Sequence, residues 1–165
     1  MLLIIIASPF GLKAAITSGN QTFGTVNPNA TSLTITTHNQ DVGSNGYLLV
    51  SISFSSLGTW GGTVTGITWN GVSMTQVLQG LININSGKVA VFELEDPGTG
   101  TNDLVFSFGS TFQGSVSYSI FSFTGAQSGG NSGINQSDPT PIEPSFTISD
   151  QSIVLGISAS NYGTT

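Results

Sequence analysis

The stretch GSVSYSIFSFT, residues 114–124, decides the fold of this chain. Its first half alternates serines with three apolar residues, Val116, Tyr118 and Ile120. That period of two is typical of a β-strand with one face buried, and its aromatic and β-branched residues favour a central strand. Further along, Phe121 and Phe123 fall in step with the serines instead. This change predicts either a β-bulge near Ile120 or a strand that is covered on both faces.

Similar short apolar runs, separated by turn residues, cover most of the rest of the chain. We expect strands at residues 17–26, 32–38, 47–54, 63–69, 72–78, 80–85, 88–95, 104–108, 146–148 and 153–158. Asn70-Gly71 is a strong hairpin signal, because a type I′ turn needs positive φ at both central residues. No segment keeps a helical period. The sequence therefore predicts an all-β fold, an antiparallel β-sandwich of jelly-roll or immunoglobulin-like type.

The N-terminal segment has several possible roles. We separate residues 1–15 from residues 16–165, which we treat as a single sandwich domain. The segment starts with an apolar run that is too short to span a bilayer, Leu2, Leu3, Ile4, Ile5 and Ile6. It fits a signal remnant, with Ala14 and Ala15 as the small residues before a cleavage point. It also fits a buried strand or, because no partner for it is evident in the chain, a donor strand for a neighbouring copy.

Charge is scarce, and this excludes several classes of partner. Charged residues make up 6% of the chain, Lys13 and Lys88 are its only lysines, arginine is absent, and the formal net charge is −6. So few cations cannot neutralise the phosphates of a nucleic acid, and they disfavour an anionic membrane surface. The absence of cysteine excludes disulfides, thiolate metal sites and cysteine nucleophiles.

Three groups of polar residues offer chemistry, but none has the motif that the chemistry needs. They are His38 with Asp41, Glu93 with Glu95, and Asp96 with Asn102 and Asp103. The first lacks the nucleophile elbow of a serine hydrolase, and a histidine in a polar loop explains it. The glutamates share one strand face, which suits a solvated edge strand better than a glycosidase cleft. The third group brackets a turn and lacks the EF-hand pattern of calcium ligands. We therefore predict no enzyme, metal or cofactor.

Two aromatic residues are candidates for ligand binding. Trp60 lies among glycines in a loop, where an exposed indole could stack on a sugar ring, or could fold back over the core. Tyr47 is the second candidate. The triplets that begin at Asn20, Asn29 and Asn135 match the N-glycosylation sequon, but a chain this rich in asparagine, serine and threonine contains such triplets by chance.

Five pieces of the sequence together resemble a known type of module. They are YLLVSISF, VTGITWNGVSMTQV, VAVFELEDPGTGTNDLVFSF, VSYSIFSFTGA and QSIVLGISAS, which contain the turns WNG, PGTGT and FTG. Over residues 31–160 their order resembles a widespread family of uncharacterised secreted β-sandwich modules of bacterial, archaeal and viral surface proteins. The resemblance implies extracellular display, and no activity. Because such modules usually continue for another strand pair, the resemblance also implies either that the chain is incomplete or that its last strands come from elsewhere.

These observations favour one function and leave one alternative. We expect a non-enzymatic extracellular structural module, displayed at a cell or virion surface or assembled into a pilus-like filament by strand donation. Its main partner would then be another copy of itself. The alternative is a carbohydrate-binding or adhesive module that uses the loop aromatics. Neither requires nucleic acid or a membrane span.

Overall fold

The structure is a computed structural model of the chain, and it describes residues 2–6, 15–41, 45–55, 63–81, 87–126, 132–134 and 153–157. Within these residues there is no helix, and strands make up most of the structure, as the sequence predicts. The strands are β1 (Leu2–Ile6), β2 (Thr17–Val26), β3 (Asn29–Ile35), β4 (Asn39–Gln40), β5 (Gly46–Ser55), β6 (Val64–Trp69), β7 (Val72–Ser73), β8 (Thr75–Leu81), β9 (Gly87–Glu95), β10 (Gly100–Thr101), β11 (Leu104–Gln113), β12 (Val116–Thr124), β13 (Ser132–Ile134) and β14 (Ile153–Ile157).

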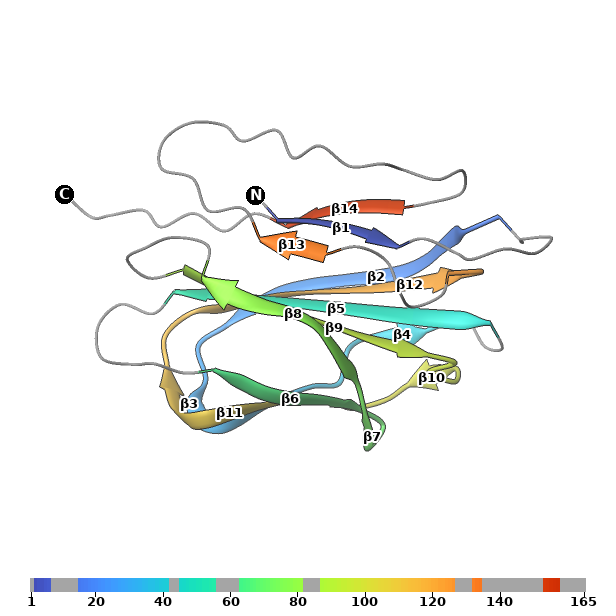
Figure 1. Cartoon of the computed structure of the whole chain (residues 1–165). Coiled ribbons are helices and arrows are strands. Elements are labelled where there is room, and N and C mark those ends of the chain that lie inside the picture. Colours follow the sequence, from blue (N-terminus) through green and yellow to red (C-terminus); the bar gives the residue numbers. More distant parts are fainter. Residues whose placement is uncertain are drawn as a thin grey trace.

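The strands form antiparallel sheets that pack in layers (Figure 1). A five-stranded sheet has the order β2-β12-β5-β9-β8, and a four-stranded sheet has the order β3-β11-β6-β7. A three-stranded sheet, β13-β1-β14, lies on the other side of the five-stranded sheet (Figure 1). The short strands β10 and β4 pair with each other. The fold is therefore sandwich-like, with a further sheet outside the sandwich.

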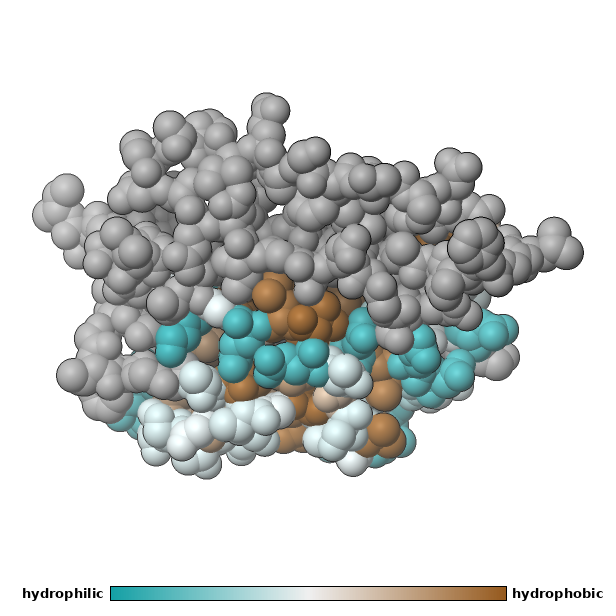
Figure 2. Space-filling view, viewed as in Figure 1, coloured by the Kyte–Doolittle hydropathy of each residue, from teal (hydrophilic) through white to brown (hydrophobic). Residues whose placement is uncertain are grey.

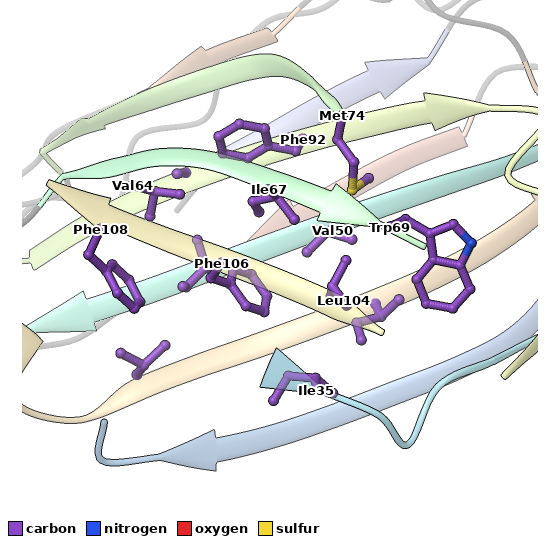
Figure 3. Close-up of a cluster of buried hydrophobic side chains, with 14 of the residues drawn as sticks. Ile35, Val50, Val64, Ile67, Trp69, Met74, Phe92, Leu104, Phe106 and Phe108 are labelled. Carbon is purple, nitrogen blue, oxygen red and sulfur yellow. The ribbon is translucent and has the colours of Figure 1, made fainter. Parts of the chain in front are cut away.

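The main core lies between the five-stranded and four-stranded sheets. Its largest fully buried side chains include Trp69 and Phe106, which come from adjacent strands of the four-stranded sheet (Figure 3). From β12, Val116 and Ile120 are buried in this core, and Tyr118 packs against it. The alternation at residues 116–120 thus identifies the inward face of the strand.

The outward face of β12 explains why its apolar pattern changes. Phe121 packs against a second buried cluster, made up of Tyr47, Leu49, Val89, Val91, Phe123 and Ala126. The pairing of β12 with β5 runs from Val116 to Thr124 without a register shift. The interpretation of a strand covered on both faces is therefore confirmed. A register shift does occur against β2, where Phe121 and Phe123 pair with Gln21 and Ser18, so the extra residue belongs to β2.

The strand β1 has partners within its own chain. It pairs with β14 from Leu2↔Ile157 to Ile6↔Ile153, and its other side pairs with β13. The expectation that this apolar run lacks a partner is therefore wrong. Sequence inspection missed it because β13 and β14 are short and lie far from β1 along the chain.

Two further expectations concern the middle of the chain. The turn at Asn70-Gly71 is confirmed, because φ is positive at both residues, 49° at Asn70 and 76° at Gly71. By contrast, β9 is not an edge strand, because it lies between β5 and β8. Its Val89 and Val91 are buried, so the face that carries Glu93 is not simply solvated. The sequence could not show this, since the cover on that face comes from other parts of the chain.

Candidate functional site

A cluster of polar side chains is buried at one end of the main core. His38 lies between β3 and β4, Gln40 in β4 and Ser122 in β12, and all three are almost fully buried. Thr22 of β2 adds a half-buried hydroxyl. The indole of Trp69 meets the imidazole of His38 edge to face, with ring centroids 5.7 Å apart. The sequence places His38 in a polar loop, and the structure shows that this loop residue is buried.

The hydrogen bonds of this cluster fix the direction of its protons. Ser122 donates its hydroxyl proton to Oε1 of Gln40. Its Oγ, 3.0 Å from Nε2 of His38, must then accept the N–H of the imidazole. Nδ1 is left as an acceptor, and it lies 2.9 Å from the Thr22 hydroxyl, which donates to it. The described residues contain no buried side-chain polar atom without a hydrogen-bond partner.

The electrostatics of the cluster favour a neutral imidazole. Burial lowers the pKa of His38 below its ordinary value of 6.5. The hydrogen bond to Gln40 and the negative charge of Asp41 act in the opposite direction, and they are smaller effects. At neutral pH the cluster is therefore an uncharged hydrogen-bonded network inside an apolar core.

This arrangement differs from a Ser-His-Asp triad in two respects. In a triad the histidine accepts the proton of the serine, whereas here His38 donates to Ser122. A triad also needs a carboxylate on the other ring nitrogen, but Thr22 occupies that position and Asp41 accepts the backbone N–H of Asn20 at 3.0 Å. The cluster can stabilise the end of the core, but its serine is not activated as a nucleophile.

Sequence reasoning paired His38 with Asp41 and missed Ser122. The sequence does indicate the position of Ser122, because it is two residues after Ile120 and therefore lies on the same, inward face of β12. A serine at a core-facing position needs a buried partner. What the sequence did not indicate was the identity of that partner, 84 positions away.

A second polar contact lies on the outward face of the five-stranded sheet. Tyr47 is fully buried, and its hydroxyl donates to Oε2 of Glu93. Burial, the hydrogen bond and the charges of Glu93 and Glu95 raise the pKa of the Tyr47 phenol, which therefore stays protonated. Its ring offers no exposed face on which a sugar could stack, and the other aromatic candidate, Trp60, lies outside the described residues.

The acidic turn after β9 is held by hydrogen bonds between Asp96 and the backbone at the start of β5. Asp96 accepts the N–H of Asn45 at 2.9 Å, and its own N–H donates to the carbonyl of Gly46 at 2.9 Å. Its φ of 47° is the left-handed conformation that aspartate tolerates in turns. Across the part of the chain that the structure describes, no group of three histidine, aspartate or glutamate side chains is placed to hold a metal ion.

The sequons fall in different places. Asn20 is exposed on β2, but its side-chain amide donates to the carbonyl of Asn39 at 3.0 Å, and the hydroxyl of its sequon threonine bonds to His38. Asn29 is exposed at the start of β3, and Asn135 lies outside the described residues. Of the first two, Asn29 is the more accessible.

The surface feature that stands out is the outer edge of the five-stranded sheet. Its edge strand β2 is 10 residues long, TSGNQTFGTV, with neither a charge nor a proline. Phe23 in this strand is 61% exposed, the highest value among the large apolar side chains that the structure describes. Natural edge strands are usually protected by charges, prolines or covering segments, and β2 carries neither of the first two.

Comparisons of the chain with protein-family models, with curated proteins and with solved structures found no match. Among the described residues, no helix is long and apolar enough to cross a membrane.

Proposed function

We propose that this chain is a non-enzymatic structural module, a sandwich of jelly-roll or immunoglobulin-like type that acts outside the cell and associates with copies of itself. The observation that carries the proposal is the open, uncharged edge strand β2. A strand of this kind exposes backbone N–H and C=O groups that a second chain can pair with.

Two other features support a structural role. Every buried side-chain polar atom among the described residues has a hydrogen-bond partner. In the pair Ser122 and His38, the imidazole donates to the serine and does not accept its proton, as nucleophilic attack would require. The chain is also weakly charged, because charged residues make up only 6% of it. Figure 2, which is coloured by hydropathy, shows pale and teal residues with brown patches between them on the described surface in that view. With few like charges, copies would repel each other only weakly.

Strand donation is one form that the association could take. Because β1 pairs with β13 and β14 of its own chain, the same strand from a neighbour could take the same place without any new contact. The alternative, a carbohydrate-binding module, depends on Trp60, and no observation on the described residues favours it.

Sedimentation velocity over a wide range of protein concentrations tests the proposal, with electron microscopy to detect filaments. We expect the average mass to rise with concentration. A variant that lacks residues 1–13 distinguishes donation of β1 from pairing at the edge of β2. If this variant assembles as the full chain does, β1 is not the donated strand. A full chain that stays monomeric at the highest concentration contradicts the proposed function.

A further inference from the structure

The open part of β2 is shorter than the strand. Near its start, Asn20 is covered, because its backbone N–H donates to Asp41 and its side chain to the carbonyl of Asn39. Beyond this point residues 21–26 alternate between exposed and half-buried, and among the described strands β12 is the one that pairs with them. Six residues of strand span about 20 Å, which is long enough for a regular antiparallel pair.

The opposite edge of the same sheet is in a different situation. There β8 contacts β13 of the three-stranded sheet, and its pairing with β9 contains a register shift between Gln76 and Leu78. Contact with another sheet and a bulge are two of the ways in which proteins protect an edge. The register shift of β2 against β12 falls before Gln21, so residues 21–26 form a regular stretch of strand, and they carry the exposed Phe23.

We propose that β2 pairs antiparallel with β2 of a second copy, around a two-fold axis that passes beside Phe23. The inference rests on the proposed function and specifies its interface. Residues that pair across such an interface have their side chains on the same side of the joined sheet. Only registers that pair odd-numbered residues with odd-numbered residues, and even with even, are therefore allowed. In the register centred on Phe23, this residue faces its own copy, Gln21 faces Thr25, and Thr22 faces Gly24.

This register is favoured because of the aromatic residues. Phe23 already meets Phe121 of β12 edge to face, with ring centroids 5.5 Å apart. A two-fold axis beside Phe23 would bring two such pairs together and would cover the most exposed apolar side chain of the described surface. The neighbouring registers would place Phe23 against Gln21 or Thr25, which gains less apolar contact.

Gly24, next to Phe23 in the strand, is covered by an aromatic ring. Gly24 lies under the ring of Tyr118, which occupies the space that a β-carbon on Gly24 would need. An aromatic ring over a cross-strand glycine shields a backbone position that would otherwise be open to water. The consequence of the two-fold axis is a closed dimer with one continuous ten-stranded sheet, because isologous contacts do not propagate. Any filament would need a second interface.

Two exposed apolar residues provide a matched pair of variants. Phe23→Lys places two like charges face to face at the axis, whereas Val72→Lys makes the same change at a side chain that is 54% exposed on the four-stranded sheet. By sedimentation velocity, we expect Phe23→Lys to weaken dimerisation by at least about tenfold, and Val72→Lys to change it by less than about twofold. Equal urea midpoints for both variants and the parent chain, measured at a concentration at which the parent chain is monomeric, show that folding is intact.

The register is tested by cross-linking, for which the absence of cysteine is convenient. A mixture of Gln21→Cys and Thr25→Cys chains should form a disulfide-linked heterodimer on mild oxidation, and neither variant alone should do so. Cross-linking by either variant alone would overturn this register. A parent chain that self-associates while Phe23→Lys has no effect would overturn the β2 interface and leave the proposed function standing. A monomeric parent chain would overturn both.

Discussion

Replacing Ser122 by alanine tests whether the buried polar network holds the end of the core together. The change removes one hydroxyl that accepts the N–H of His38 and donates to Gln40. Gln40 Oε1 also lies 3.4 Å from Nε2 of His38, so these two groups can form a direct, longer hydrogen bond. The hydrogen bond from Ser122 to Gln40 is then lost, and the N–H of His38 keeps only the longer contact to Gln40.

The expected cost follows from these two losses. Leaving a buried polar group without its partner costs about 1–3 kcal/mol, and the direct contact recovers part of this, so we expect the free energy of unfolding to fall by about 2 kcal/mol. In a chain of this size that corresponds to a melting temperature lower by about 4–8 °C. Urea denaturation monitored by tryptophan fluorescence measures the change, because Trp69 contacts the ring of His38.

A matched control lies on the same strand. Ser117 is exposed on the opposite face of β12, where its hydroxyl is 3.1 Å from that of Thr25. Because water can replace this partner, Ser117→Ala should change the free energy of unfolding by less than about 0.5 kcal/mol. If Ser122→Ala costs no more than this control, the network does not stabilise the fold and the reasoning is refuted.

Two further predictions concern pH and backbone conformation. Because the pKa of His38 is lower in the folded chain than its ordinary value of 6.5, the unfolded chain binds the proton more readily below pH 6.5. Stability should be complete above that pH and should decrease as the pH falls towards the folded pKa; a His38→Gln variant that shows the same decrease would contradict this. Neither Gly71 nor Gly66 has an atom within 4 Å of an added β-carbon, but only Gly71 has positive φ, at 76°. Gly71→Val should therefore cost about 1–3 kcal/mol in urea denaturation and Gly66→Val nearly nothing, and equal costs would show that the turn conformation is not responsible.

The sequence predicted the parts of the fold that depend on neighbouring residues. The strand at residues 116–124 and the turn at Asn70-Gly71 both follow from alternation and turn chemistry, which act over a few residues. What it missed depends on distant pairing. The partners of β1 and the interior position of β9 are set by how the sheets assemble, and no local pattern encodes that.

The candidate site shows the same division. The parity of Ser122 places it in the core, yet its partners come from β2, from β4 and from the link before β4. Sequence reasoning instead joined His38 to Asp41 because they are close in the chain. In the folded chain that carboxylate turns to the backbone of Asn20, where it covers the edge of β2. Asp41 thus bonds to the backbone of β2, and Thr22 takes the place on Nδ1 of His38.

The composition of the chain explains why an open edge remains. Charged side chains, lysine especially, are one device that protects edge strands, but this chain has only Lys13 and Lys88, and Lys88 lies in the interior strand β9. Its edges are instead protected by contact: β8 lies against β13, and Asn20 of β2 is covered by Asp41 and Asn39. In the part of the chain that the structure describes, the contacts of Asp41 and Asn39 lie at Asn20 and come before residues 21–26, which carry the exposed Phe23. A chain that protects its edges by contact would complete the same strategy here with a second copy of β2.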